Sequence, residues 1–165
     1  MSAAAAPMAP VRSFVLGPRE SRTAAPLNIV GEETLVKVGP ADSDGLLALF
    51  HLDAPPMSGP PRHVHSREDE VFYVLEGELV FELDGVSHTI STGGTVYLRR
   101  GVVHAYQNFT DKPARLLIAT TPGHFSVYFE EMSAMTPPGG MPEMGALAEL
   151  SERYGLTFTG PPMTA

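Results

Sequence analysis

Residues 59–77 read GPPRHVHSREDEVFYVLEG, and the polar groups in this stretch guide the interpretation of the whole chain. His63 and His65 lie two positions apart, so on an extended segment both rings point to the same side, with Cα atoms about 6.6 Å apart. A strand predicted over residues 71–75 returns past them, and Glu70 stands at its start. Two imidazoles and one carboxylate can therefore reach a common point.

A third imidazole comes from a later stretch, where His104 and Tyr106 share one face of another predicted strand. Three neutral imidazoles and one carboxylate suit one divalent transition metal: iron, nickel, manganese, cobalt, copper or zinc. Calcium and magnesium prefer oxygen donors. Four protein ligands leave one or two positions open on an ion that takes five or six, which is typical of a catalytic site. The predicted metal ligands are His63, His65, Glu70 and His104.

Simpler interpretations exist for these residues. The spacing of the four ligands could be accidental, but four ligand types within two spaced motifs favour a metal site. Glu70 alone could be a surface carboxylate, yet an ion beside it removes the cost of burying an unpaired charge. Tyr106 could donate a hydrogen bond to a substrate or a ligand ring, or it could simply fill the barrel, and both interpretations stay open. Glu70 and Tyr106 are the candidate catalytic residues.

Other histidines and arginines fit ordinary structural roles better. His88 lies on the apolar face of its hairpin, where a hydrogen-bonded histidine in the sheet is a better interpretation than a fifth ligand. Arg99 and Arg100 could attract an anionic substrate, but exposed loop charges are the favoured interpretation.

The composition favours a β-rich fold. Sixteen glycines, sixteen prolines and only 8% aromatic residues point to many turns between short elements. Asp84 and Gly85 lie between two alternating runs and predict a tight type I′ hairpin that pairs Leu83 with Val86. About nine to eleven strands are expected, enough for a small closed or sandwiched barrel. Predicted strands outside this hairpin cover residues 13–16, 27–30, 34–38, 46–52, 71–75, 95–98, 103–109 and 114–121.

The apolar pattern changes period near the C-terminus. Phe125, Tyr128, Phe129 and Met132 recur at helical spacing, which predicts a helix that covers part of the barrel and walls its cavity. A second helix is predicted over residues 142–154. The expected organisation is a disordered leader at residues 1–12, a β-barrel at 13–122 and a helical extension packed on the barrel at 123–165.

The net charge and the lack of cysteine limit which binding partners and metal ligands are expected. Eleven basic and nineteen acidic side chains give a net charge of −8, which disfavours nucleic acid and anionic membrane surfaces. With no cysteine, the chain has no disulfide and no thiolate, so a metal must bind through nitrogen and oxygen. The expected partner is a small-molecule substrate, and the cytoplasm is the default location.

The two motifs resemble those of the cupin superfamily. Residues 59–77 resemble the first cupin motif and residues 93–108 the second, with a spacer of cupin length between them. Within the superfamily, the chain is most similar to single-domain proteins called quercetin 2,3-dioxygenase-like, and residues 123–131 and 153–162 add to that likeness. Two positions depart from the pattern: the early motif glycine is Met57, and the proline of the second motif is Arg99. The matching positions are His63, His65, Glu70, Gly77, Gly93, Gly101, His104 and Asn108.

The resemblance carries several implications. It implies an all-β cupin fold, a double-stranded β-helix or jelly-roll barrel, with one or two short C-terminal helices. It also implies a metal-dependent dioxygenase that uses O₂ to open an electron-rich enol or flavonol, with Glu70 both ligating the metal and accepting the substrate proton. A metal-dependent isomerase, cyclase or decarboxylase of a small carbonyl or polyketide-like compound is one alternative, and a non-enzymatic binding module is another. A homodimer is expected by analogy.

Overall fold

The computed structural model describes residues 13–137 and 140–164, so the predicted leader at residues 1–12 lies outside the described residues. Eleven strands and two α-helices follow one another in this part of the chain. They are β1 (Leu27–Ile29), β2 (Glu32–Val38), β3 (Ala48–Ala54), β4 (His63–His65), β5 (Asp69–Glu76), β6 (Glu78–Leu83), β7 (Val86–Ser91), β8 (Thr95–Leu98), β9 (His104–Gln107), β10 (Ala114–Thr121), α1 (Phe125–Met135), α2 (Met144–Arg153) and β11 (Leu156–Phe158).

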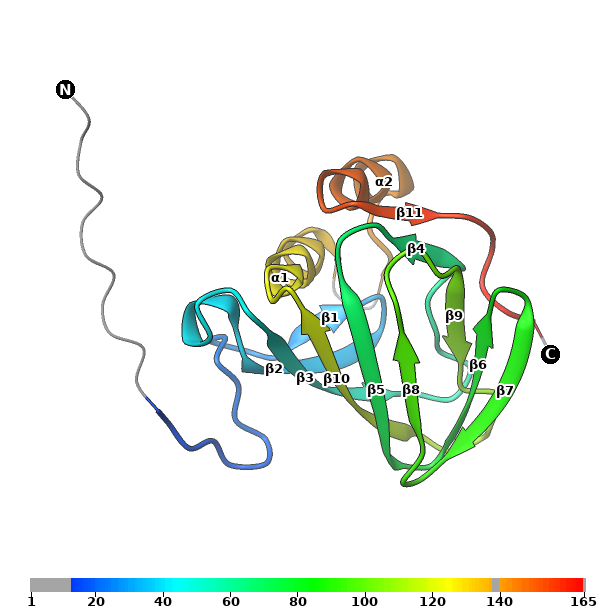
Figure 1. The fold of residues 1–165 in the computed structure, drawn as a ribbon, viewed down its shortest axis with the longest axis horizontal. Coiled ribbons are helices and arrows are strands. Elements are labelled where there is room, and N and C mark those ends of the chain that lie inside the picture. The colour runs from blue at the N-terminus through cyan, green and yellow to red at the C-terminus, as the bar shows by residue number, and fades with distance from the viewer. Residues whose placement is uncertain (1–12, 138–139, 165) are drawn as a thin grey trace.

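The strands form two antiparallel sheets that face each other (Figure 1). The six-stranded sheet has the order β1-β2-β3-β10-β5-β8, and the five-stranded sheet has the order β11-β4-β9-β6-β7. Chain neighbours β3 and β4 lie in different sheets, and so do β5 and β6, so the chain passes from one sheet to the other as it does in a jelly roll. The predicted all-β cupin architecture with two short helices is confirmed.

Local sequence signals set the clearest hairpin. Asp84 and Gly85 have φ values of 47° and 82°, the left-handed conformation that a type I′ turn requires at both central positions. Leu83 pairs with Val86, as the turn predicts, and Phe81 pairs with His88 further along the ladder. The hairpin joins β6 to the edge strand β7 of the five-stranded sheet.

The core lies between the two sheets and is built by alternation along each strand. In β3, residues 48, 50, 52 and 54 are buried while the residues between them are partly exposed. Large apolar side chains from both sheets fill the interior. The largest of them with almost no exposure are Phe50, Phe81, Leu52, Leu79, Leu98 and Leu116, and Phe125 of α1 joins them in the core.

The predicted C-terminal helices are confirmed, but a strand follows them that the sequence did not reveal. Helix α1 contacts β1, and α2 contacts α1 and β11, so the helices cover one side of the barrel (Figure 1). After α2, Gly155 takes a φ of 75° and the chain continues as β11, which pairs with β4. The C-terminal segment therefore completes the sheet that carries His63 and His65. In the described chain, no helix has both the length and the apolar character needed to cross a membrane.

The strand predicted at residues 13–16 is wrong. These residues form no strand, and Val15 is 94% exposed. The segment that follows is bound by a side chain instead of by a strand. Lys37 donates hydrogen bonds to the carbonyls of Gly17, Pro18 and Glu20. Gly17 and Pro18 directly follow the apolar run, and proline lacks the N–H that a ladder needs, so the run has no partner strand.

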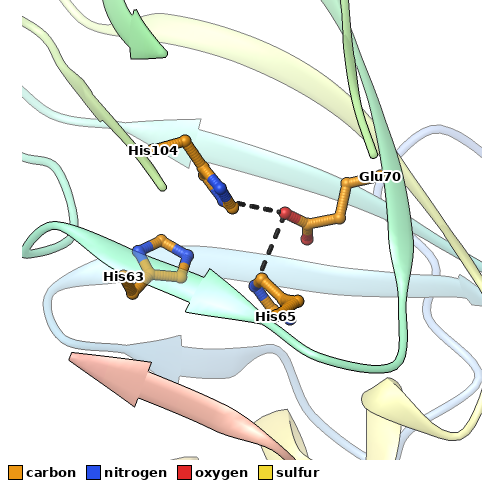
Figure 2. A group of neighbouring side chains, drawn as sticks. All are labelled: His63, His65, Glu70 and His104. Carbon is orange, nitrogen blue, oxygen red and sulfur yellow. Dashed lines mark ion pairs between the residues drawn. The ribbon is translucent and has the colours of Figure 1, made fainter. Parts of the chain in front are cut away.

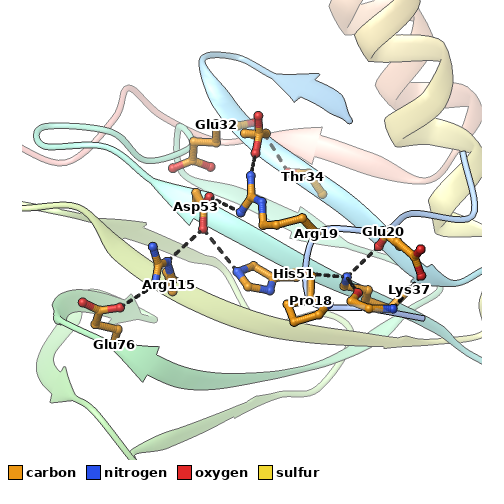
Figure 3. Close-up of polar contacts among 12 residues, drawn as sticks. Pro18, Arg19, Glu20, Glu32, Thr34, Lys37, His51, Asp53, Glu76 and Arg115 are labelled. Atoms are coloured by element: carbon orange, nitrogen blue, oxygen red, sulfur yellow. Dashed lines mark hydrogen bonds and ion pairs between the residues drawn. The ribbon is translucent and has the colours of Figure 1, made fainter. Parts of the chain in front are cut away.

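Charged side chains gather on the outer face of the six-stranded sheet, over β2, β3, β10 and β5 (Figure 3). Asp53 is their centre: Arg19, His51 and Arg115 all approach its carboxylate, at 2.8, 3.2 and 3.4 Å. Most of these groups are half-exposed to solvent. We call them the outer network, which consists of Arg19, Glu33, His51, Asp53, Glu76 and Arg115.

Candidate metal centre

The structure brings all four predicted ligands together at one buried point inside the barrel (Figure 2). One donor atom from each of them lies within 4.8 Å of the other three. Ligand atoms that share one ion at bond lengths of about 2.1 Å span up to roughly 4.2 Å, so movements of a few tenths of an ångström would close the set around an ion. The four residues are His63, His65, Glu70 and His104.

Strand pairing explains how residues from separate motifs meet. His63 pairs directly with His104 across β4 and β9, and their ring centroids are 4.3 Å apart. His65 follows on the same face of β4, with its ring centroid 5.1 Å from that of His63. Glu70 approaches from β5 in the opposite sheet: its Oε2 atom is 3.1 Å from Nε2 of His104 and 3.5 Å from Nε2 of His65.

Two of the three histidine rings are oriented by a hydrogen bond from Nδ1. Nδ1 of His63 donates to the carbonyl of Pro61 at 2.8 Å, and Nδ1 of His104 donates to the carbonyl of Val102 at 3.0 Å. Since a carbonyl only accepts, the proton of each neutral ring sits on Nδ1 and the lone pair sits on Nε2, which is the atom that faces the shared point.

The third ring, that of His65, has a carboxylate in place of a carbonyl. Its Nδ1 atom lies 3.5 Å from Oε2 of Glu68, and both side chains are almost fully buried. Neither atom has a hydrogen-bond partner among the described residues. A carboxylate behind a ligand histidine fixes the ring and makes it a stronger donor. Glu68 was not identified from the sequence, where it looks like one more polar residue in a turn.

Unpaired buried atoms test whether this group fits a metal ion. Nε2 of His65, Nε2 of His104 and Oε2 of Glu70 are buried without a hydrogen-bond partner in the described structure. Buried polar atoms are rarely left without a hydrogen-bond partner, because each unpaired atom costs free energy of folding. All three point at the same place and all three are metal donors, so the residues fit a divalent transition ion.

The protonation states of the group are consistent with that fit. Burial, together with the charges of His104 and His65, lowers the pKa of His63 to about 3, so this ring is neutral at pH 7. Burial raises the pKa of Glu70, but the facing imidazoles of His65 and His104 outweigh it and bring this pKa to about 2. Burial lowers the pKa of His65, but the carboxylates of Glu70 and Glu68 raise it further, so the net shift is upward. An ion would therefore displace a proton from His65.

A cavity opens from this group toward the helices, and its lining is mostly apolar. Aromatic side chains from α1, β5, β9 and β11 form much of the wall, as the helical pattern predicted for Phe125, Tyr128 and Phe129. Its ionisable side chains are acids, histidines and tyrosines, and no lysine or arginine of the described chain lines it. The ionisable residues are Glu32, His63, His65, Glu70, Tyr106 and Tyr128.

Tyr106 lies in this cavity wall, and its hydroxyl group donates to a residue that sequence reasoning missed. The acceptor is Oε2 of Glu32, at 2.5 Å. Oε1 of the same carboxylate accepts from the Ser58 hydroxyl at 2.7 Å. Glu32 is only 3% exposed. It lies between the strands predicted at residues 27–30 and 34–38, so only the fold reveals that its side chain faces inward.

The loop before β4 contains Met57, one of the two departures from the cupin motif. A Cβ atom on Gly59 would lie 2.1 Å from the carbonyl oxygen of Tyr106, so only glycine fits there. Met57 takes a φ of 61°, a left-handed conformation that glycine adopts more readily. The buried amide of Asn108 donates to three backbone carbonyls of the neighbouring loops and holds them in place.

The remaining polar candidates lie away from the ligand group. His88 is exposed on β7, and His51 belongs to the outer network, so neither is a fifth ligand. Arg99 is exposed, and Arg100 pairs with Asp69 at 2.9 Å. The interpretation of these arginines as loop charges agrees with their positions.

The chain resembles known proteins in both sequence and structure. Residues 50–120 match the protein family described as "Cupin domain". Over 74 residues the chain is 27% identical to the tetracenomycin polyketide synthase protein TcmJ of Streptomyces glaucescens, a match that covers 45% of this chain and 50% of that protein. The chain spans about half the length of the curated relatives it matches.

Solved structures support the fold. A sugar phosphate isomerase of the cupin superfamily from Silicibacter pomeroyi superposes with a TM-score of 0.51 at 26% identity, over 62% of this chain and 69% of that one. A conserved protein with a double-stranded β-helix domain from Klebsiella pneumoniae gives 0.53 at 18% identity, over 68% and 92%. Residues 50–120 therefore resemble a cupin domain in sequence, and the described chain has the cupin fold.

Proposed function

We propose that this chain is a metal-dependent enzyme that acts on a small, uncharged and mostly apolar molecule with an enol or phenol group, and that its reaction is a dioxygenation. The observation that carries the proposal is the convergence of three histidines and one glutamate, with unpaired donor atoms, at one end of an apolar cavity. The quercetin 2,3-dioxygenase-like resemblance supplies the reaction class.

His63, His65, Glu70 and His104 would hold the ion. A bound divalent ion would act as a Lewis acid toward a substrate oxygen and, if redox-active, would supply electrons for O₂ chemistry. Three of these ligands come from the five-stranded sheet, where β4 supplies a pair of imidazoles and β9 supplies the third, and Glu70 comes from β5 of the six-stranded sheet. The protein side chains fix these donors before any substrate enters.

The rest of the cavity selects and shields the substrate. Its apolar and aromatic lining would bury a flat ring system and exclude water from the reacting oxygen. The absence of a lysine or arginine among the described lining residues disfavours phosphorylated sugars and dicarboxylates, since a bound ion could pair with one anionic charge but no lining cation could pair with a second. An enol or phenol enters uncharged and loses one proton inside.

A Lewis-acid cyclase or isomerase acting without O₂ is the second candidate. It is favoured by the similarity to a protein named as part of tetracenomycin polyketide synthase. Polyketide intermediates carry enol and phenol groups on apolar frames, so the same cavity chemistry would suit them.

Metal analysis followed by an oxygen-electrode assay tests the proposal. We expect about one transition-metal ion per chain. We also expect O₂ uptake with 3-hydroxyflavone or a related flavonol that stops after chelation and in His104→Ala but persists in His88→Ala, where the lost histidine is exposed. Turnover that is equal under strict anaerobiosis would favour the cyclase or isomerase. Uptake unchanged by chelation and by His104→Ala would contradict both.

A further inference from the structure

Glu32 occupies an unusual place for a carboxylate. A two-residue turn with positive φ at Val30 and Gly31 joins β1 to β2 and sets Glu32 directly opposite Ile29. Both side chains are buried and line the cavity, on the wall formed by the six-stranded sheet. The same cavity reaches the metal ligand Glu70.

The partners of Glu32 are all neutral. Its two oxygens accept one hydrogen bond each, from the hydroxyls of Tyr106 and Ser58. No lysine, arginine or histidine of the described chain forms an ion pair with it. Burial raises the pKa of Glu32, and the hydrogen bonds from Tyr106 and Ser58 lower it by less, so the result is a pKa of about 7.

A purely structural role does not require this carboxyl group. Glu32 links the loop at Ser58 to β9 through Tyr106, but a glutamine could make a similar link without an ionisable group. Burying a group that ionises near neutral pH costs stability, and such groups concentrate at functional sites.

Glu32 also lines the same cavity as the ligand group. Tyr106, whose hydroxyl binds Glu32, lies two residues after His104 on β9. Its ring centroid is 5.8 Å from that of Phe72, and Phe72 lies two residues after Glu70 on β5. The contact between Glu32 and Tyr106 is thus one layer away from the metal ligands, along the same two strands.

We propose that Glu32 is a catalytic residue that accepts the proton of the substrate enol or phenol. This inference rests on the proposed function. In the step, the substrate O–H bond breaks, the proton passes to a carboxylate oxygen of Glu32, and the electron pair stays on the substrate oxygen, so no oxidant is consumed. Glu70 then acts as a metal ligand, and the acceptor is a different carboxylate.

The other ionisable groups that face the cavity are His63 and His65 from β4, Glu70 from β5, Tyr106 from β9 and Tyr128 from α1. The first three belong to the ligand group. Tyr106 and Tyr128 both have raised pKa values because of burial, so neither hydroxyl loses its proton near neutral pH. Glu32 is the lining carboxylate outside the ligand group.

Counting the protons released on ligand binding tests the role directly. Metal-loaded protein is titrated with 3-hydroxyflavone by calorimetry under nitrogen, in buffers of different ionisation enthalpy. At about pH 8 the wild type should release close to zero protons per bound flavonol, because Glu32 retains the proton, whereas Glu32→Gln should release about one. Glu33→Gln, whose carboxylate is exposed and pairs with Arg19, is the matched control and should behave like the wild type.

The wild type alone gives a second measurement if Glu32→Gln does not fold. Below about pH 6.5 Glu32 is already protonated, so release should rise toward one proton per ligand as the pH falls. Equal proton release by the wild type and Glu32→Gln, or release by the wild type that does not change with pH, would overturn the role of Glu32 and leave the proposed function standing. A metal-loaded wild type that does not bind 3-hydroxyflavone would instead contradict the flavonol-type function, and the inference with it.

Discussion

The buried ligand group and the outer network both bring charged and polar side chains to short distances, but the two regions differ in whether each charge has an opposite partner. In the outer network, Arg19 and Arg115 face the carboxylates of Asp53 and Glu76, so every charge has an opposite partner and contacts solvent. Inside the barrel, Glu70 faces only imidazoles, and several donor atoms have no partner among the described residues.

This difference separates a structural arrangement from a functional one. Exposed pairs gain little free energy because water screens them, and losing one partner costs little. Buried donors that converge without partners are costly unless something charged binds between them. The contrast predicts large effects from changes inside the barrel and small ones outside it.

The largest effect is expected from removing a ligand. His104→Ala should lower metal affinity beyond the roughly 10–100-fold that the loss of a mere supporting partner costs, because one of four donors disappears. Metal content after gel filtration, measured by mass spectrometry, checks this. His88→Ala is the control, since that histidine is exposed on β7. Full metal content in His104→Ala would mean that the ligand group is not the metal site.

Glu32 should govern part of the pH dependence of folding. Its folded pKa of about 7 exceeds its ordinary value of 4.5, so the protonated acid is favoured in the folded state. The contribution of this group to the stability of the wild type should therefore be greatest below about pH 4.5. As the pH rises through 7, the wild type should lose up to about 3 kcal/mol of unfolding free energy.

Glu32→Gln should lack that loss, so its unfolding free energy relative to the wild type should rise with pH. Urea unfolding across this pH range, in chelator, measures the difference. Glu33→Gln, on the exposed side of β2, should follow the wild type. A constant difference between Glu32→Gln and the wild type would show that Glu32 titrates normally.

The support behind His65 should have an intermediate effect. Glu68→Gln keeps the shape of the side chain but removes its charge from behind Nδ1 of the ring. Metal affinity should fall by about tenfold, as measured by competition with a chromophoric chelator. Glu76→Gln, in the outer network, should leave the affinity unchanged. If Glu68→Gln binds metal like the wild type, the 3.5 Å contact with His65 has no role in holding the ion.

The smallest effect is expected outside the barrel. Arg115→Ala removes partners of Asp53 and Glu76, but its side chain is half-exposed, so unfolding free energy should fall by at most about 1 kcal/mol. This loss should shrink further at about 1 M salt, where screening is strong. A loss of several kcal/mol in urea unfolding would erase the proposed distinction between the two regions.

The sequence predicted those features that depend on local spacing. The hairpin at Asp84–Gly85 was predictable because its turn type requires particular residues, and the ligands were predictable because two of them alternate on one short strand and all four fall at motif spacings. The inward orientation of Glu32 was not, since it depends on the pairing of Glu32 with Ile29 and on contacts with distant Tyr106. Strand β11 was missed for a similar reason, because its sheet partner among the described strands is β4, far back in the chain.

The apolar run at residues 13–16 shows the opposite failure. It has the composition of a strand, but it pairs with no strand of residues 13–137 and 140–164, and Lys37 binds the carbonyls of the segment that follows. Composition alone predicts the capacity to form a strand. Whether a partner is within reach depends on the rest of the fold.

The pairing of β11 with β4 also sets an order of events during synthesis. All four ligand residues have been translated once His104 is made, yet the strand that carries His63 and His65 gains its second neighbour only when Leu156–Phe158 leaves the ribosome. Until then, His63 and His65 lie on an open edge of the sheet, and their strand pairs with β9 through a single pair of residues. A nascent chain would therefore bring the four donor side chains into their final arrangement late, after the C-terminal strand has paired with β4.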